Sequence, residues 1–442
     1  MIDGKGLTYV IEQIMSEGDN DLARDVLDFF EKKAESIEDY DVLGDLSVKA
    51  KYFHMRLKCA EYCYVHATTS EQLYNARHNL QSCYNSLNYP EKALFYIEQN
   101  LKINPDDCDS LVEKSFNLSL MGKRLEAEQI IETLSKKDEK IAKNIDFSLS
   151  YKLLRNGETS RGLRGFNDTF KGTNPLFENK LKMKRWEGGA YPGKTIIING
   201  EGGIGDEIIN IRFMDYLKKL GMKPILYSSW NMYRPDIVDL FKRHGHDVVT
   251  TSFFFRKEYM WTHMMSIPGL LGLKEEQLWN GTYLKPLRNP KNKLKDNNKL
   301  RIGIKCNGNI YFEQDYYRSI PIDEMISAIP KEFSIYYFDK EKDHDGVISL
   351  KDNLNTWEDT LDYIDQMDVI LSSCTSLPHA SGAIGKKTIV CVPIAKYYTW
   401  VSTKTDNSTP WYGDNFTVLE QTTPRCWKEP LLKVNQLLRE MI

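Results

Sequence analysis

A glycine-rich turn that carries carboxylates is the first feature of the sequence that could do chemistry. Residues 199–207 read Asn-Gly-Glu-Gly-Gly-Ile-Gly-Asp-Glu. The apolar run 195–198 before the turn is typical of a short buried strand, and apolar residues recur at helical spacing from Ile208 to Leu220. Backbone N–H groups at a helix start favour negative charge, so we expect Asp206 to stay ionised and able to accept a proton. The alternative is a structural strand-turn-helix of any α/β domain, because a glycine cluster alone is a weak signal.

A second turn, nearer the C-terminus, is rich in hydroxyl groups. Residues 372–379 read Ser-Ser-Cys-Thr-Ser-Leu-Pro-His and follow the apolar run 369–371. Thr375 or Ser376 can cap the helix that begins there, and a helix start with hydroxyls and free N–H groups is a ready site for a diphosphate. His379, one turn into the helix, can add a hydrogen bond or a positive charge. The alternative is a capped helix with a histidine at its surface.

Strand-like and helical segments alternate from residue 195 onward. This alternation implies parallel sheets covered by helices on both faces. The polar, basic and proline-bearing stretch 285–299 is predicted to be a solvated linker between two Rossmann-like lobes. Open α/β sheets bind ligands beyond the carboxyl ends of their strands, so two facing lobes would form a cleft. The predicted strands are residues 195–199, 223–228, 247–250, 300–306, 334–339, 369–373 and 388–393.

The first part of the chain has a helical pattern throughout. From about Leu7 to Phe170 apolar residues fall at three- and four-residue spacings. A shift of 34 residues places Tyr84 on Leu118 and Ala93 on Ala127, an order that resembles tetratricopeptide repeats. Such helix pairs cannot bury their apolar faces alone, so they stack and leave a concave surface. We expect this surface to hold an acceptor, to dock a protein partner or another copy of the chain, or only to support the second domain.

Potential metal ligands occur in this helical part. Cys59, Cys63 and His66 fall on one helix face, but no fourth ligand is near them in the sequence. Small core positions of a helical repeat explain the cysteines better, so no metal site is predicted.

Length and composition disfavour several classes of protein. The chain has 442 residues, enough for two or three domains, and its net charge of -3 supplies no basic footprint for nucleic acid or for an acidic membrane surface. No apolar run approaches a membrane span, and the N-terminus has no hydrophobic signal-peptide core, so a cytoplasmic protein is expected. The eight scattered cysteines indicate reduced thiols.

The order of motifs from Trp186 to Trp427 resembles the tetratricopeptide-repeat proteins of bacteria and phages that end in a glycosyltransferase domain. That domain is similar to the heptosyltransferase family and more distantly to the O-linked N-acetylglucosamine transferases. The resemblance implies a GT-B fold, in which a helical solenoid is followed by an acceptor-side and then a nucleotide-sugar-side Rossmann-like lobe. It rests on the two turns together with Met-Ser-Ile-Pro-Gly-Leu-Leu-Gly at 265–272, Arg-Ile-Gly-Ile-Lys-Cys-Asn-Gly-Asn at 301–309, Tyr-Arg-Ser-Ile-Pro at 317–321 and Tyr-Tyr-Thr-Trp at 397–400.

The predicted fold class is therefore an all-α part followed by an α/β part. The predicted boundaries are residues 1–170 for the helical repeats, 171–193 for a connector, 194–290 for the acceptor-side lobe, 291–299 for the linker and 300–442 for the nucleotide-sugar-side lobe.

The resemblance also implies roles on the acceptor side. The acidic residue of a Gly-x-Gly-Asp turn is the proposed general base in heptosyltransferase-like enzymes, and Asp206 holds that position here. Glu201 or Glu207 could replace it as the base. The rest of the acceptor-side loop is Gly202, Gly203 and Gly205.

On the donor side, a Thr-x-x-x-His loop binds the donor diphosphate in that family, and Thr375 and His379 match it. Cys374 stands where the family usually has an aspartate, which puts any role for a carboxylate there in doubt. The other predicted donor-binding residues are Lys305, Arg318, Ser376 and Tyr398. Lys305 and Arg318 could equally form ordinary ion pairs. Tyr398, with its neighbours in the 397–400 stretch, could stack on a nucleotide base or lie in the core.

These roles imply a transferase that moves a sugar from a nucleotide-diphosphate donor to a hydroxyl of a protein, glycan or other acceptor. Inversion in a single displacement is expected, with no cofactor and no obligatory metal. One alternative is a protein of this fold that has lost catalysis and binds partners through its repeats. Another is an enzyme acting on modified bases in DNA, which the near-neutral charge disfavours.

Overall fold

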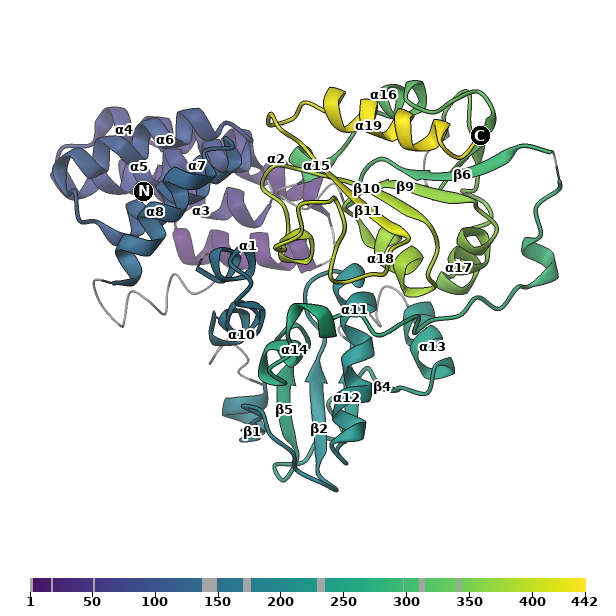
Figure 1. Cartoon of the computed structure of the whole chain (residues 1–442). Coiled ribbons are helices and arrows are strands. Elements are labelled where there is room, and N and C mark those ends of the chain that lie inside the picture. The colour runs from purple at the N-terminus through teal and green to yellow at the C-terminus, as the bar shows by residue number, and fades with distance from the viewer. Residues whose placement is uncertain are drawn as a thin grey trace. The chain divides into compact units, whose positions relative to one another are not determined.

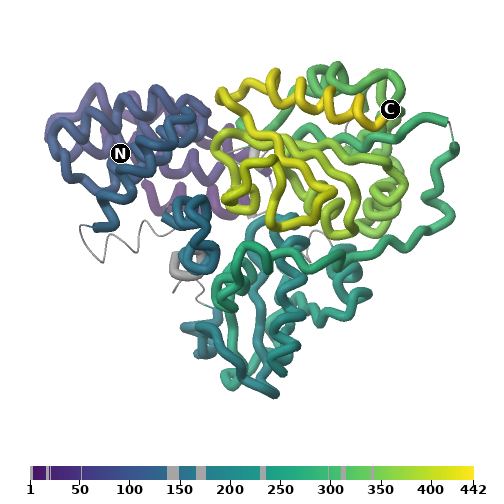
Figure 2. The backbone as a smooth tube through the Cα atoms, viewed as in Figure 1, coloured from purple at the N-terminus to yellow at the C-terminus, as the bar shows by residue number. Residues whose placement is uncertain are grey.

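The computed structural model describes residues 3–16, 19–50, 52–136, 149–169, 176–228, 235–296, 298–309, 315–339 and 343–442. The chain forms two compact units, Met1–Lys137 and Asp138–Ile442, which can be followed in Figures 1 and 2. The predicted boundary at residue 170 and the start of the predicted connector lie outside the described residues.

The first unit is a stack of helices in which each helix packs against the next. Capping boxes begin two of the helices, pairing Ser36 with Asp39 and Thr69 with Gln72. Ala93, a small residue of the predicted repeat, is fully buried. This stack confirms the predicted helical solenoid. Its helices are α1 (Gly4–Ser16), α2 (Asn20–Glu31), α3 (Ile37–Lys49), α4 (Phe53–His66), α5 (Ser70–Ser86), α6 (Pro90–Ile103), α7 (Cys108–Leu120) and α8 (Arg124–Ser135).

The cysteine and histidine side chains on α4 have structural surroundings. Cys59 and Cys63 are buried in the core of the stack, and burial raises the pKa of the Cys59 thiol to about 12. His66 stacks on Tyr62 and contacts its carbonyl oxygen through Nδ1 at 2.9 Å. Within the described part of the chain, no three His, Cys, Asp or Glu side chains are grouped closely enough to hold a metal ion. All eight cysteines are free thiols.

The described part of the second unit starts with helical residues 149–155, continues through helix α10 (Thr159–Thr169) and the short π-helix η1 (Leu176–Lys180), and leads into a first α/β lobe. Five parallel strands form the sheet of this lobe in the order β1-β5-β2-β3-β4. The strands are β1 (Lys184–Arg185), β2 (Thr195–Asn199), β3 (Lys223–Tyr227), β4 (Asp247–Val249) and β5 (Met260–His263). The helices are α11 (Ile204–Asn210), η2 (Ile211–Phe213), α12 (Met214–Lys219), α13 (Pro235–Arg243), η4 (Met264–Ser266), α14 (Ile267–Leu270) and η5 (Glu275–Gln277).

Helix α10 packs directly on α14 of this lobe. A Cβ atom on Gly269 would lie 2.6 Å from the backbone nitrogen of Arg164, so only glycine permits this approach. The hydroxyl of Ser160 donates to the carbonyl oxygen of Gly269 at 3.2 Å. The end of the predicted helical region is therefore part of the second unit.

A second α/β lobe follows. Its six parallel strands have the order β11-β10-β9-β6-β7-β8. The strands are β6 (Leu300–Lys305), β7 (Phe333–Tyr337), β8 (Ile348–Ser349), β9 (Val369–Ser373), β10 (Thr388–Val392) and β11 (Phe416–Glu420). The helices are α15 (Asp315–Arg318), α16 (Ile322–Ser327), α17 (Trp357–Asp365), α18 (Ser376–Ala383), η7 (Tyr398–Trp400) and α19 (Lys428–Arg439). The predicted α and α/β fold with paired Rossmann-like lobes is thus confirmed.

All seven predicted strands are present close to their predicted bounds, but four further strands were not predicted. Strands β1 and β8 are only two residues long. Strand β5 lies in the run Met-Trp-Thr-His-Met-Met, which is buried on both faces and leads into helical turns without a break. Strand β11 was not predicted either, although its residues are buried or half-buried, as in a strand of a covered sheet.

The two lobes share one hydrophobic core. A continuous cluster of buried residues runs from the first sheet to side chains of the second lobe. Between α13 and α17, the Arg243 guanidinium contacts Glu358 through two hydrogen bonds of 2.6 Å. The carboxylate of Asp236 accepts from the Trp357 N–H at 2.8 Å. The lobes are therefore held together by packing and by charged contacts.

The linker between the lobes, η6 (Pro290–Asn292) and its flanks, is not simply solvated as predicted. The buried carboxylate of Asp362 accepts from the N–H groups of Arg288 and Asn289 at 2.6 and 2.7 Å, and from the side chain of Asn292 at 3.1 Å. These bonds attach the linker to α17. Among the described residues, no helix is both long and apolar enough to cross a membrane.

Candidate active site between the two lobes

Each of the two chemically promising turns leaves its sheet where the strand order reverses. In the first lobe the chain runs outward from β2 through β3 to β4 and returns to β5 on the other side of β2, and Asn199 is in register with His263 there. In the second lobe it runs outward from β6 and returns to β9, where Lys305 is in register with Ser372. Such switch points are where open parallel sheets bind ligands.

The helices that follow these turns, α11 and α18, lie against each other (Figure 1). Gly205 forms the contact. A Cβ atom there would lie 2.9 Å from Cδ2 of His379 and 3.3 Å from the Cα atom of Ser376. The predicted acceptor-side and donor-side loops are therefore brought together by the fold.

Asp206 lies in the first turn of α11. Its Oδ2 atom accepts from the Gly203 N–H at 2.7 Å, which fixes the orientation of the carboxylate. Gly202 has φ +72, a conformation that favours glycine, and a side chain there would meet Asp206. Burial raises the pKa of Asp206 to about 6; the Gly203 N–H and the Arg318 charge lower it, and the Glu201 charge raises it.

The expectation from the sequence, an ionised carboxylate able to accept a proton, is compatible with this pKa at neutral pH. The N–H group at the helix start is present, but the loss of water around the carboxylate outweighs it. Asp206 is mainly ionised at pH 7 and is protonated below about pH 6. A carboxylate with a pKa near the working pH suits proton transfer better than one that titrates near 4.

Glu201 fastens the first turn to the end of β5. Its Oε2 atom lies 3.0 Å from Nδ1 of His263, and its Oε1 atom accepts from the Met265 N–H at 3.0 Å. Both side chains are buried. Glu201 is thus occupied in positioning the loop, although its charge reaches Asp206.

Glu207, the other predicted substitute base, is fully buried. The Ser228 hydroxyl lies 3.1 and 3.0 Å from its two carboxylate oxygens, and Gly200 leaves room for it because a Cβ atom there would collide with Oε1. Burial raises the pKa of Glu207 to about 7. Glu207 is therefore a poorer candidate for the base than Asp206, because its carboxylate is fully enclosed.

The donor-side turn has the predicted cap. Thr375 is the N-cap residue of α18, and its hydroxyl oxygen lies 3.4 Å from the Leu377 N–H. The hydroxyls of Ser372 and Thr375 lie 3.3 Å apart. Ser376 is half-buried at the first position of the helix. The turn therefore presents the start of an eight-residue helix toward the first lobe.

His379 is neither at the surface nor charged. Nδ1 lies 2.8 Å from the Tyr412 hydroxyl, and the ring stacks on Trp400 with centroids 5.0 Å apart. Burial, together with the nearby Arg212 and Arg318 charges, lowers the pKa of His379 to about 3. This environment favours the first of the two roles expected for His379, a neutral ring that donates or accepts a hydrogen bond; a positive charge beside a bound phosphate stays a prediction.

Arg318 contacts the donor-side turn directly. Its Nη1 atom donates to the carbonyl oxygen of Cys374 at 3.0 Å, and its Nε atom donates to Asp315 at 2.8 Å. Gly308 leaves room for this guanidinium, because a Cβ atom there would collide with it. The charge lowers the pKa values of Asp206 and His379, so it acts on both walls of the cleft.

Cys374 contributes its carbonyl group and not its thiol. The side chain is buried, and burial raises the pKa of the thiol to about 12, so the sulfur stays protonated. Lys305, at the end of β6, forms an ion pair of 2.6 Å with Asp339. The ion-pair alternative for Lys305 is therefore present in the structure.

Tyr398 was predicted to bind the donor, but its side chain is 2% exposed. Its hydroxyl accepts from Nδ2 of Asn210 at 3.1 Å, and the same nitrogen donates to the Asp206 carbonyl oxygen at 2.9 Å. Trp400 is also buried. The core interpretation of these aromatic residues is correct, and Tyr398 instead links the second lobe to the helix that carries Asp206.

Arg212 is a central residue that the sequence analysis missed. It is 2% exposed, and Nη1 donates to the carbonyl oxygens of Leu278 at 3.4 Å and Trp411 at 2.8 Å. No carboxylate pairs with it among the described residues, and its Nη2 atom is buried there without a hydrogen-bond partner. The signal was a single charge inside the apolar run from Ile208 to Met214. The guanidinium lies within 6 Å of the ring centroids of Phe213, Trp279, Tyr283, Trp411 and Tyr412.

Among known proteins, the chain is similar to a set of solved structures. No protein-family model matches the chain, and no curated protein matches it. The iron-containing dodecameric glycosyltransferase TibC from enterotoxigenic E. coli is 10% identical with a TM-score of 0.40, over 57% of this chain and 78% of that one. The glycosyl transferase family 9 protein from Veillonella parvula is 10% identical with a TM-score of 0.36, over 57% and 97%.

An O-GlcNAc transferase mutant from Thermobaculum terrenum is similar over nearly the whole chain. It is 11% identical with a TM-score of 0.37, and the match covers 99% of this chain and 92% of that one. These structures belong to the kinds of protein that the sequence motifs resemble.

Proposed function

We propose that the protein is a glycosyltransferase that moves a sugar from a nucleotide-diphosphate donor to an acceptor hydroxyl. The observation that carries the proposal is the approach of α11 to α18 through Gly205, which sets a carboxylate with a pKa of about 6 beside a capped helix start and a guanidinium. The sequence resemblance supplies the sugar as the transferred group.

Asp206 is the proposed general base. It would remove the proton from the acceptor hydroxyl as that oxygen bonds to the anomeric carbon. The bond from this carbon to the diphosphate oxygen breaks in the same step, and its electron pair leaves with the nucleotide diphosphate. Attack from the face opposite to the leaving group inverts the anomeric centre.

The leaving diphosphate would be stabilised from the second lobe. Free N–H groups at the start of α18, the Thr375 and Ser376 hydroxyls and the Arg318 guanidinium can all face a developing negative charge. Neutral His379 could add one hydrogen bond. We propose that these groups supply the positive potential, so that transfer needs no metal or other cofactor.

The helical unit has its own place in the proposal. Stacked helix pairs offer a surface for an extended acceptor or a protein partner, and we propose that the unit positions one of them in the cytoplasm. Nothing in this role requires the repeats to take part in the chemical step.

Nucleotide binding is the decisive test of the proposed function. The full chain would be heated with a panel of nucleoside diphosphates and nucleotide sugars, with the matching nucleosides as controls. A ligand at 100 times its Kd should stabilise the folded protein by about 2.7 kcal/mol, a shift that a thermal melt resolves. If no member of the panel raises the Tm above its nucleoside control, the proposal fails.

A further inference from the structure

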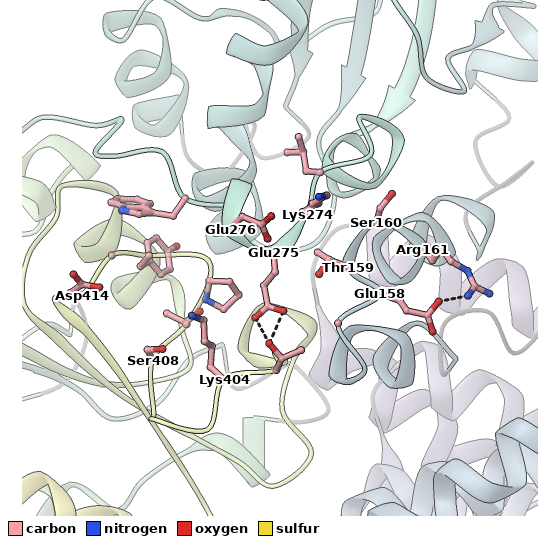
Figure 3. Close-up of a pocket in the computed structure, with 18 residues that line it drawn as sticks. Glu158, Thr159, Ser160, Arg161, Lys274, Glu275, Glu276, Lys404, Ser408 and Asp414 are labelled. Atoms are coloured by element: carbon pink, nitrogen blue, oxygen red, sulfur yellow. Dashed lines mark hydrogen bonds and ion pairs between the residues drawn. The ribbon is translucent and has the colours of Figure 1, made fainter.

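One cavity of the second unit is lined by residues outside the candidate active site. It has a volume of about 730 Å³ and is lined by three separate segments: the start of α10, residues 273–279 of the first lobe and residues 403–414 of the second (Figure 3). None of the predicted catalytic or donor-binding residues is among the residues that line it. Its volume is that of a small-ligand site.

Two aromatic side chains form part of its wall. Trp279 and Tyr412 have ring centroids 5.8 Å apart and planes inclined at 61°. Arg212 packs on both rings, 5.6 and 5.1 Å from their centroids, so the pair is held in place. Trp279 remains half-buried rather than fully enclosed. The C–H face of a pyranose ring is apolar and can pack on an exposed indole ring, while the hydroxyl groups at the edge of the pyranose stay free for hydrogen bonds.

The charges around the cavity nearly balance. Arg161, Lys274 and Lys404 are the basic lining residues, and the acidic ones are Glu158, Glu275, Glu276 and Asp414. Figure 3 shows Glu158 paired with Arg161 and Glu275 bonded to Thr403, whose hydroxyl lies 3.0 Å from both carboxylate oxygens. A cavity with this balance gives no advantage to a polyanion such as a nucleotide diphosphate.

Hydrogen-bonding groups of both kinds are present along the rim. The carboxylates of Glu276 and Asp414 are exposed and accept hydrogen bonds, and the ammonium groups of Lys274 and Lys404 are exposed and donate them. A neutral molecule with many hydroxyl groups matches this set. Five serine and threonine side chains also line the cavity, of which those of Thr159 and Thr409 are buried; the others are Ser160, Thr403 and Ser408.

We propose that this cavity binds a neutral saccharide, as a site separate from the cleft and distinct from the sugar that is transferred. A mono- or disaccharide would place a ring against Trp279 and direct hydroxyl groups to Glu276, Asp414 and the two lysines. This inference goes beyond the proposed function and does not depend on it.

The site has a direct connection to the cleft through Tyr412. Its ring lines the cavity, while its hydroxyl lies 2.8 Å from Nδ1 of His379 on the donor-side helix. A saccharide against this ring therefore contacts a residue that also holds the proposed donor site.

The test is calorimetric titration of the full chain with glucose, galactose, mannose, N-acetylglucosamine and α- and β-linked disaccharides. We expect at least one to bind with a Kd of millimolar or lower, and Trp279→Ala to weaken that binding by tenfold or more. Because Trp279 also packs near Tyr283, Asp414→Ala is a second variant that removes an exposed carboxylate and leaves the aromatic wall in place, with an expected loss of threefold or more.

Phe253→Ala is the matched control, since Phe253 is an exposed aromatic residue of the first lobe that does not line the cavity. The proposal is overturned if no saccharide of the panel binds, or if binding survives both cavity variants unchanged. Nucleoside diphosphate binding is measured separately on the wild-type chain, where its absence would count against the transferase proposal and not against the saccharide site. The same binding should be retained by both cavity variants if they are correctly folded.

Discussion

Gly205 of the first lobe lies so close to His379 of the second that a Cβ atom on Gly205 would stand 2.9 Å from the Cδ2 atom of the ring. The same Cβ atom would be 3.3 Å from the Cα atom of Ser376, and a backbone atom can move aside less easily than a side chain. His379 itself is held by Tyr412 and Trp400 and has little freedom to retreat. The distance between α11 and α18 is therefore limited by the contact at Gly205.

Gly205→Ala should therefore push the lobes apart. Overpacking of this kind costs about 1–3 kcal/mol, and we expect a lower Tm together with weaker transfer. Gly44→Ala in α3 is the control, because its Cβ atom would meet Cys59 at an ordinary 3.5 Å. A Gly205→Ala protein with wild-type stability and activity would show that the observed contact is not required.

Asp206→Asn should abolish transfer while leaving donor binding intact. Asparagine can still accept from the Gly203 N–H but cannot take the proton, and the loss of a general base is expected to slow turnover by about 10²–10⁴-fold. The measurement is the rate of sugar transfer alongside the Kd for the nucleotide sugar. Asp215→Asn, on the surface of α12, is the matched control. Full activity in Asp206→Asn would assign the base to another group.

The pH profile of kcat/KM should report the ionisation of Asp206. With a pKa of about 6, activity should rise with pH, reach half its plateau near pH 6 and level off above it. The Glu201 charge raises this pKa and the Arg318 charge lowers it, so Glu201→Gln should move the midpoint down and Arg318→Ala should move it up. Shifts in the same direction would contradict the assignment.

Arg318→Ala should weaken binding of the diphosphate group specifically. Charge-assisted hydrogen bonds to phosphate are among the stronger polar contacts, and we expect a loss of about tenfold to a hundredfold for a nucleoside diphosphate with little change for the nucleoside. Calorimetry with both ligands separates the two effects. Arg439→Ala, on α19, changes the same type of residue away from the cleft. Equal losses for both ligands would indicate a general disturbance of the fold.

Titration of Glu207 should make the stability of the folded protein depend on pH, and Glu207→Gln should remove this dependence. A carboxyl that titrates near 7 when folded and near 4.5 when unfolded favours folding below pH 4.5, and this contribution is lost as the pH rises through 7. The full effect is up to about 3 kcal/mol. The Tm of Glu207→Gln relative to wild type should therefore increase between pH 4.5 and pH 8. A constant difference over this range would show that Glu207 titrates normally.

The sequence predicted well those parts of the fold that depend on local patterns. The strand before the first turn and the strand before Cys374 have their predicted bounds, because short apolar runs flanked by turn residues leave little choice. The Thr375 cap was predicted for the same reason, since hydroxyl side chains at helix starts act locally. Strand β5 was missed because a strand buried on both faces has no alternation to detect.

The candidate site was predicted in its location but not in its charges. Burial decides whether Asp206 or His379 carries charge at a given pH, and burial comes from residues distant in the sequence such as Trp400 and Tyr412. The same holds for Glu207, whose enclosure depends on Ser228 at the end of another strand. Spacing along the chain could not reveal these contacts.

Arg212 has a consequence for any attempt to exchange the lobes between related proteins. Its guanidinium belongs to the first lobe, yet one of its acceptors, the Trp411 carbonyl, and one of its stacking partners, Tyr412, belong to the second. A chimera with a foreign second lobe would strand a buried charge without its acceptor, which is costly whatever the quality of the remaining packing. A chimera should therefore keep the first lobe together with residues 403–414 of the second, and its junctions should lie outside both segments.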